Sequence, residues 1–328
     1  MLITNKGYIG IAKQTGKGSA AATSDIFIKY LDESFKTERN TTPLREGGDG
    51  EMVVTQILNV HKEKFQFKVI ARPRIAAYLF AWILGEDTKS GGADPYTHVL
   101  TRSVGGRCWL TIRRKLDTNV IQKLTDCKIE KITFEGEAGK ECIFTVDGIG
   151  LSSAIESSEE TATYETMRPF VFYHGHGRFK VESAATSNIK KFSVQYGIKS
   201  QEGMQTDNFL IEDLPDLMID GDVALDLYAS DTTFWKKANY NNTAAPVETV
   251  YSGAFELDLR QTETATDDRG IKIEVGKFFW NPVDLGLKGA AEVMTNTIAG
   301  VMAKPAAGEM FQVTCKNDIS ADLANAGS

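Results

Sequence analysis

The sequence predicts a mainly β protein made of two tandem β-sandwich or barrel units, each with one short α-helix. Three observations support this prediction: short runs alternate apolar and polar residues, helical patterns are few, and the two halves repeat one order of segments. The 328 residues are 42% hydrophobic and 25% charged. That composition is typical of globular proteins and excludes a disordered chain.

Several runs alternate with a period of two, which places one face of a strand in a core and the other against a polar environment. Such short runs, separated by turn-forming Gly, Asp and Asn, favour a β-sandwich or barrel. The runs are Phe65–Val69, Cys108–Ile112, Cys142–Val146, Val223–Leu227, Phe255–Leu259 and Ile271–Val275.

Two segments are expected to be helical. Arg74–Leu84 follows Pro73, which suits a first helical turn, and precedes Gly85, which suits a C-terminal cap. Thr232–Tyr240 is the second, with Thr232 or Asp231 as its N-cap. No apolar run reaches the roughly 18 residues of a membrane span, and the N-terminus lacks the apolar core of a signal peptide. We therefore expect neither a membrane partner nor export.

The two halves show the same series of segments. Ser19–Ile26 resembles Ser183–Ile189, and in each half a strand pattern, a long polar segment, a second strand pattern and a helix follow. Then come a strand ending in Arg (Arg113 or Arg260), two more strand patterns and an aromatic strand (Phe170–Tyr173 or Phe311–Thr314). The series predicts an arm at 1–24, one unit at 25–165, a second at 166–316 and a tail at 317–328. Two unrelated β domains with chance matches are the alternative.

Each half contains a long polar segment that is expected to be a loop, at 32–50 and at 201–221. Loops of this length inside a compact domain usually have a function.

Charge is unevenly divided between the two halves of the chain. Residues 1–150 have 22 basic and 18 acidic side chains, a net of +4, and residues 151–328 have 15 and 26, a net of −11. Either both ends are solvated surface, or the chain stacks basic to acidic on copies of itself, or it lines a passage with acid.

No motif for catalysis, metal binding or cofactor binding is complete. Gly10–Ser19 departs from P-loop spacing, and His174 and His176 offer two zinc ligands where a site needs three or four. The 4 cysteines have no CxxC spacing and are expected to be buried thiols. We therefore expect no catalytic residue, no metal and no cofactor, and the net acidity disfavours a nucleic-acid-binding surface.

The ordered segments resemble the major tail tube proteins of long-tailed, siphophage-type bacteriophages, and the resemblance covers most of the chain. In the second half it rests on VESAATSNIKKFSVQYGIKSQEG, LMIDGDVALDLYASDTTFWKK, YSGAFELDLRQ and GIKIEVGKFFWNPVDLG. In the first half it rests on Glu46–Glu51, TRSVGGRCWLTIRRK and IEKITFEG. These are patterns of a β fold and not of a catalytic site.

The resemblance implies a structural virion protein whose rings stack into a tube. The tube houses the tape-measure protein and conducts DNA, and each tube domain adds a sheet to a continuous inner β-barrel with a helix outside. Two such domains per chain would make a trimeric ring pseudo-hexameric, with a hexameric ring as the alternative. Implied partners are other copies of the chain, the tape-measure protein, tail terminator and tail-tip proteins, and passing DNA that is not bound specifically. The implied location is the virion tail, after assembly in the bacterial host cytoplasm.

The resemblance also gives candidate site residues. Acidic strand faces along the lumen would repel DNA phosphates, and the lumen candidates are Asp222, Asp226, Glu256, Asp258, Lys272 and Glu274. The corresponding first-half positions are Trp109, Thr111 and Arg113, with Lys128, Lys131 and Lys140 nearby. Polar faces turned to outer solvent are the alternative. The long loops would contact the next ring through Glu38, Arg39, Arg45, Asp49, Asp207, Glu212, Asp213 and Asp216.

Other virion components with the same fold remain alternatives, namely a tail terminator, a baseplate hub or the inner tube of a contractile tail. A carbohydrate-binding β-sandwich is a more distant one. Its aromatic platform would consist of Trp82, Trp109, Trp235 and Trp280.

Overall fold

The protein is mainly antiparallel β, as the sequence predicts. The computed structural model describes residues 7–44, 55–172, 179–182, 184–186, 189–204, 211–228, 232–261, 269–283 and 295–324. The helices are α1 (Pro73–Leu84) and α2 (Thr233–Tyr240). The strands are β1 (Ile9–Lys13), β2 (Ile26–Ile28), β3 (Tyr30–Leu44), β4 (Thr55–Ile70), β5 (Gly85–Ser90), β6 (Tyr96–Arg102), β7 (Leu110–Asp117), β8 (Val120–Glu137), β9 (Ile143–Glu156), β10 (Phe179–Val181), β11 (Ala184–Ala185), β12 (Ile189–Ser200), β13 (Gly203–Met204), β14 (Ile211–Asp213), β15 (Asp216–Tyr228), β16 (Ser252–Arg260), β17 (Gly270–Trp280), β18 (Thr295–Met302) and β19 (Phe311–Asn317).

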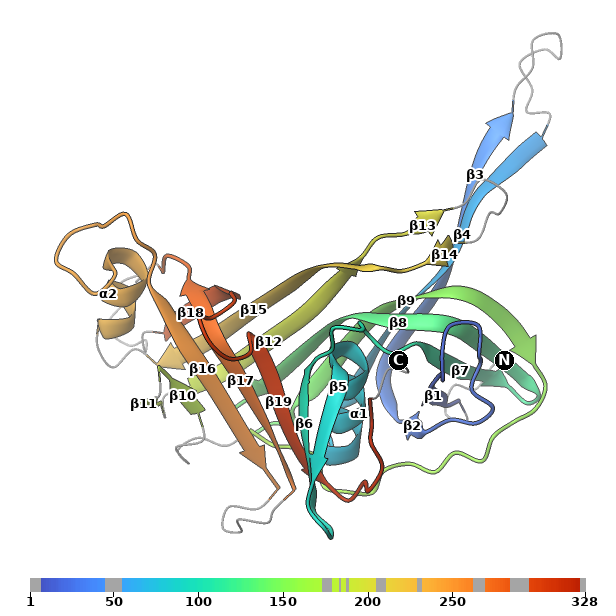
Figure 1. Cartoon of the computed structure of the whole chain (residues 1–328), viewed down its shortest axis with the longest axis horizontal. Helices are drawn as coiled ribbons and strands as arrows, with labels where there is room; N and C mark the ends of the chain where they lie inside the picture. The colour runs from blue at the N-terminus through green and yellow to red at the C-terminus, as the bar shows by residue number, and fades with distance from the viewer. Residues whose placement is uncertain are drawn as a thin grey trace.

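Thirteen of the strands form two layers around the larger of two buried clusters. The first layer has the order β3-β4-β9-β8-β12-β15-β18. The second layer, β10-β16-β17-β19-β6-β5, crosses in front of β12 and β15 (Figure 1). The layers meet where the end of β17 pairs with β18. Val223 and Leu225 of the first layer and Leu257 and Ile273 of the second belong to the same buried cluster, so the polar faces of the two layers point in opposite directions.

The two halves of the chain share one strand order. The first unit, Ile9–Glu156, has the order β3-β4-β9-β8-β7-β1-β2. The second unit, Phe179–Met302, has the order β12-β15-β18-β17-β16-β10-β11. In each unit the helix follows the second strand of this order, α1 after β4 and α2 after β15. The additions are β5–β6 and β13–β14, and the pairing that β9 makes along β8 is divided on β17 between β18 and β19. The first unit begins earlier than expected, because β1 lies within the expected arm and buries Ile9 and Ile11.

Both expected helices are present. Pro73 opens α1, and Gly85 ends it with a left-handed φ of 86°. The carboxylate of Glu165, from the segment after β9, accepts the N–H groups of Arg74 and Ile75 at 2.9 and 3.1 Å. It thereby satisfies donors that the start of a helix leaves unpaired. Thr232 precedes α2 without a side-chain cap. No helix in the described part of the chain is long and apolar enough to cross a membrane.

Two expected loops and one expected strand differ from the prediction. Residues 32–44 form most of β3, which projects with β4 beyond the body of the molecule (Figure 1). A hairpin outside the core does not need apolar alternation, so its polar sequence resembled a loop. In the segment 201–221, β15 begins at Asp216, and β13 and β14 lie before it. The segment that contains Phe170 and Phe172 forms only an isolated antiparallel bridge, between Val171 and Glu141, and no named strand. Phe170 donates its N–H to Ala71 and accepts from Cys142, and Phe172 donates to Lys140 and accepts from Gly139. Tyr173 lies outside the described residues.

Candidate functional site

The side of the first layer that faces away from the core is called the first-layer face here. It is polar and has both basic and acidic side chains. Strand register places its residues, since opposed residues of antiparallel strands share a face. Lysines pair there with acids: Lys131 with Asp147 at 3.3 Å and Lys199 with Asp220 at 3.4 Å. The ionisable members of this face are Asp32, Lys36, Glu38, Lys62, Lys64, Lys68, Lys131, Glu135, Glu137, Asp147, Lys191, Lys199, Asp220, Asp222 and Asp226.

Asp222 and Asp226 of β15 are the lumen candidates that lie on the first-layer face. Asp226 accepts a hydrogen bond from the Thr297 hydroxyl at 2.7 Å. Partial burial, together with the neighbouring charge of Asp220, raises the pKa of Asp222 above its ordinary value. Its carboxylate contacts the Gln195 amide at 3.5 Å. These acids lie among lysines of the first unit and of β12, so the face is not a uniformly acidic surface.

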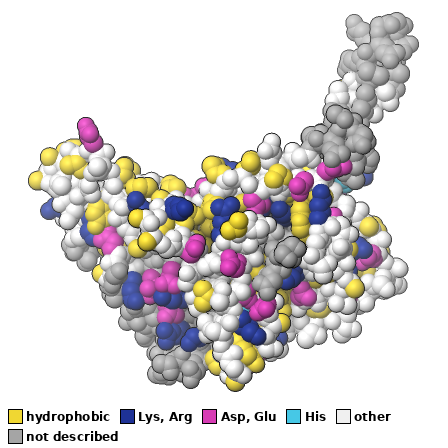
Figure 2. Space-filling model, in the orientation of Figure 1, with side chains coloured by type: hydrophobic (Ala, Val, Ile, Leu, Met, Phe, Trp, Pro, Cys, Tyr) yellow, Lys and Arg dark blue, Asp and Glu magenta, His cyan; other side chains and the backbone are white. Residues whose placement is uncertain are grey.

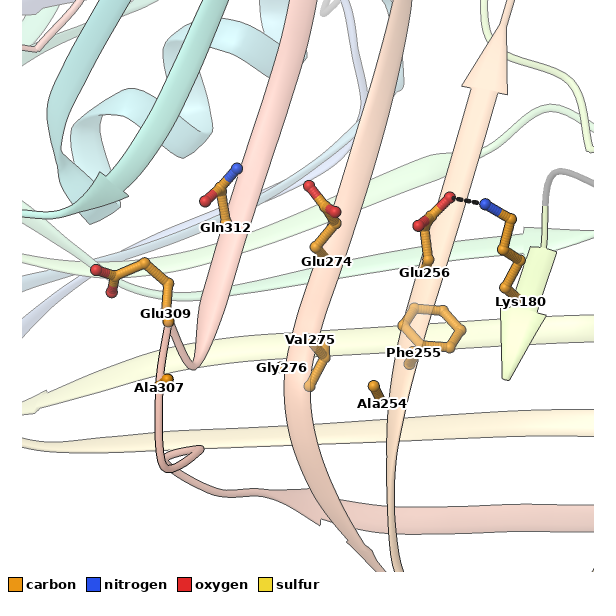
Figure 3. A pocket seen from close by; sticks show the side chains of 11 residues that line it. Lys180, Ala254, Phe255, Glu256, Glu274, Val275, Gly276, Ala307, Glu309 and Gln312 are labelled. Atoms are coloured by element: carbon orange, nitrogen blue, oxygen red, sulfur yellow. Dashed lines mark hydrogen bonds and ion pairs between the residues drawn. The ribbon is translucent and has the colours of Figure 1, made fainter. Parts of the chain in front are cut away.

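The other lumen candidates lie on the outward side of the second layer, the second-layer face. Figure 3 shows Lys180, Glu256, Glu274 and Gln312 side by side on β10, β16, β17 and β19, with first-layer strands behind them. They line a hollow of about 400 Å³ that also includes Glu309. Figure 2 shows Lys or Arg mixed with Asp or Glu on this side of the molecule.

The charges of the second-layer face are locally paired. Glu256 contacts Lys180 at 2.8 Å and Lys272 at 3.5 Å, and Lys272 contacts Glu274 at 2.7 Å. Burial alone would raise the pKa of Glu256, but its bond to Lys180 and the charge of Lys272 outweigh burial and hold that pKa below its usual value. Asp258 pairs with Arg260 at 2.7 Å.

One lumen cannot contain all six candidates, because the two layers present them to opposite sides. The strand alternation correctly separated apolar from polar positions: Val223, Leu257 and Ile273 are buried. A period of two cannot assign a strand to one of two layers, and grouping the six residues therefore required topology.

Most expected inter-ring residues do not lie in loops. Glu38 and Arg39 lie on β3, where Glu38 pairs with Lys64 at 3.1 Å and the Arg39 Nε contacts His61 Nδ1 at 3.4 Å. The Glu212 carbonyl accepts a bond from Lys17. Asp213 is exposed, and its carboxylate accepts the Leu214 N–H. Arg45, Asp49 and Asp207 lie outside the described residues.

Asp216 is not a loop residue but the centre of an internal ion cluster. Its Oδ1 accepts bonds from Arg107 Nε at 2.9 Å and Nη2 at 2.7 Å and lies 3.4 Å from Lys128 Nζ. Burial alone would raise the pKa of Asp216, but the bonds and charge of Arg107, and then Lys128, hold it below its ordinary value. Arg107 also bonds the carbonyls of Ile129 and Ile198, so the cluster joins the two units.

Sequence reasoning missed Arg107 and misplaced its neighbours. The sequence predicts Thr111 and Arg113 on the polar face of their strand and Lys128 near it, yet all three are buried. Arg113 lies 3.4 Å from Glu156 and 3.3 Å from Glu160. Lys128 lies 4.4 Å from the Trp109 ring centre. Pairing of buried charges depends on partners distant in the chain, and no local pattern identifies them.

The strand edges form the remaining surface of interest. β12 pairs with β8 from Lys191 opposite Glu137 to Gly197 opposite Lys131, which joins the units edge to edge. Among the described residues, β3 pairs with β4 on one side and with no strand on the other. An unpaired edge of this length can accept a strand from another chain.

No group of His, Cys, Asp and Glu in the described part of the chain is arranged to hold a metal ion. A search of curated proteins gave no match. The family model described as phage tail tube protein matches residues 4–302, nearly the whole chain. That family is structural and not enzymatic, its members are components of the virion tail, and the mainly β fold described above agrees with it. The chain therefore belongs to the phage tail tube protein family.

Proposed function

We propose that this chain is the major tube protein of a siphophage-type tail and that it polymerises as stacked rings around the tape-measure protein and, later, the passing DNA. The observation that carries the proposal is the pairing of β12 with β8 inside one chain, together with the edge of β3 on which no second described strand is paired. β3 occupies in the first unit the place that β12 occupies in the second.

The internal junction is the template for ring closure. β8 of the first unit accepts β12, the edge strand of the second unit in its sheet order. β17 holds in the second unit the place that β8 holds in the first, and its described residues pair with β16, β18 and β19. In the proposed ring, β3 of the following chain adds at the C-terminal end of β17, as β12 adds at the C-terminal end of β8. Closing the sheet removes its exposed edges, which otherwise invite aggregation. Three chains then supply six units of one strand order, arranged as a trimeric, pseudo-hexameric ring.

In this arrangement the first-layer face lines the lumen, because it belongs to the layer that continues from unit to unit. Its acids and lysines are interspersed, and several are paired, as Lys131 is with Asp147. Such a surface neither holds phosphates through clustered cations nor repels them uniformly. DNA therefore passes without specific binding. The second-layer face, with Glu256 and Glu274, points outward.

Electron microscopy of the purified protein tests the proposal. We expect hollow tubes or stacked rings with three chains per ring. The variant Leu31→Lys changes an exposed side chain in the bulged start of β3 and should reduce assembly of a folded monomer. Thr88→Lys on exposed β5 is the matched control. Six chains per ring would refute the trimeric ring, and a chain that remains monomeric under all conditions would refute the tube.

A further inference from the structure

The two helices occupy equivalent places in the two units but differ in burial. α1 buries nearly all of its residues, whereas no residue of α2 is buried. Phe234 and Ala238 of α2 pack on the core. Trp235 and Tyr240 of the same helix are half-buried and lie edge to face with ring centres 5.1 Å apart. A partly exposed pair of large aromatic residues is typical of a protein contact surface.

α1 is buried between strands of its own unit, β5, β6 and β8, and the strands β17 and β19 from the second half of the chain. It packs against β19, β6 and β5, and Phe80 of α1 lies 6.0 Å from Phe311 of β19, measured between ring centres. β19 pairs with the first half of β17, and its other edge is paired by β6, in the hairpin that follows α1. The helix of the first unit and the segment after it therefore cover β19, the strand that follows the second unit and pairs with its β17.

The end of β9 is the first unit's counterpart of β19. Residues Ser152–Glu156 pair with the beginning of β8, Ile121–Thr125, as β19 pairs with the beginning of β17. The pairing of β9 with β4 stops at Gly150. Ser153, Ala154 and Ile155 are exposed, with Ile155 66% exposed.

The segment after α2 corresponds in chain position to β5–β6 and is also uncovered. Residues 241–250 form no strand and are exposed or half-buried, and Val247 and Val250 are among the exposed apolar side chains. The charges near α2 and near the end of β9 are compatible with a contact between them. α2 presents the exposed cation Lys236, and the exposed acid Glu159 lies just beyond β9, where it forms an ion pair with Lys115 at 2.5 Å.

We propose that α2 and residues 241–250 of one chain dock on the end of β9 in the next chain of the ring, as α1 and β5–β6 cover β19 within a chain. The occupant is a second copy of this protein, and the inference rests on the ring proposed above. The contact buries Trp235, Tyr240 and Ile155. It is separate from the β3 edge, so each ring junction has an edge pairing and a helix contact.

Cysteine cross-linking tests the contact. The native cysteines Cys108, Cys127, Cys142 and Cys315 are buried, so introduced exposed thiols react selectively. In assembled rings, Lys236→Cys combined with Ile155→Cys should give inter-chain products with a short bismaleimide, up to the number of chains in the ring. Each single variant should give none, and neither should Lys236→Cys combined with Thr88→Cys.

Hydrogen exchange on the unsubstituted chain provides a second measurement, independent of whether the variants fold. Amides of α2 and residues 241–250 should exchange at least about tenfold more slowly in rings than in monomers. Rings that form without the cross-link and without this protection would overturn the docking inference alone. A chain that never forms rings would overturn both it and the proposed function.

Discussion

Replacing Asp216 with alanine is expected to weaken the packing of the β12–β15 hairpin of the second unit against the first unit. The substitution leaves the Arg107 guanidinium, whose side chain is 0% exposed, and the largely buried Lys128 ammonium without their shared carboxylate. Removing one member of a buried pair costs about 3–5 kcal/mol. Arg107 retains bonds to Ile129, Ile198 and Ser200, which keep the loss within that range.

Hydrogen exchange of β12 and β15 measures this loss locally and needs no assumption that the whole chain unfolds in one step. At about 1.4 kcal/mol per tenfold change, amides protected by the cluster should exchange between about a hundred-fold and a few thousand-fold faster. Asp213→Ala is the matched control, because Asp213 is exposed and its carboxylate accepts the Leu214 N–H, while it acts on Lys128 of the cluster only through its charge and not through a hydrogen bond. Exchange accelerated less than about fivefold in Asp216→Ala would refute the reasoning.

The same cluster gives a pH dependence with a defined sign. The pKa of Asp216 is lower in the folded chain than its ordinary value, so the ionised carboxylate is favoured by folding. Its contribution is fully present above the unfolded pKa of about 3.9. This contribution to stability is lost as the pH falls through the lower pKa that Asp216 has in the folded chain. The protection of β12 and β15 should therefore fall in acid in the unsubstituted chain, with less change in Asp216→Ala.

Four further outcomes are expected. Gly85→Ala should destabilise the chain by about 1–3 kcal/mol in thermal unfolding, because its φ is +86° and an added Cβ would lie 2.2 Å from the Gly106 carbonyl oxygen. Gly16→Ala is the control and should leave the stability unchanged, because its Cβ would meet nothing within 4 Å. Glu165→Ala should cost about 0.5–2 kcal/mol through the lost cap of α1, and Glu165→Gln should recover part of it. Burial raises the pKa of Cys108 to about 11, so a thiol reagent at pH 8 should label none of the 4 cysteines before unfolding and all of them afterwards. Lysines at Asp222 and Asp226 should slow DNA release from assembled tails, whereas lysines at Glu256 and Asp258 should not; equal slowing by both pairs would contradict the assignment of faces.

Local sequence signals predicted the elements whose causes are local. Pro73 and Gly85 set the ends of α1 through fixed backbone conformations, and both ends agree with the structure. Val223–Leu227, Phe255–Leu259 and Ile271–Val275 bury one face of a strand, so their alternation is visible. β3 was expected as a loop because its outer part pairs with β4 beyond the core and buries little. Strand pairing, and not burial, maintains that hairpin, and pairing partners leave no pattern within one strand.

The candidate site was less predictable because its residues are grouped by topology. Glu256 and Asp222 show the same alternation, yet they lie on opposite sides of the molecule. Asp216 was identified as an acid in a polar segment, but its role depends on Arg107, which is 109 residues away in the chain. The order of segments gave a repeat, whereas the register that joins β8 to β12 could come only from the fold.

The two junctions of the proposed ring have different requirements, and the strand edges reflect this. The β8–β12 junction forms within one chain, at high effective concentration, and the buried Arg107–Asp216 ion pair stabilises it. The β3 edge must remain unpaired in a free monomer and pair only during assembly. It has register shifts after Tyr30 and Asn40 and is dense in charge, with Asp32, Glu33 and Lys36 near its start. Bulges and charged side chains discourage indiscriminate strand addition. In the proposed ring, the proposed contact of α2 with β9 would then select the neighbour to which the β3 edge pairs.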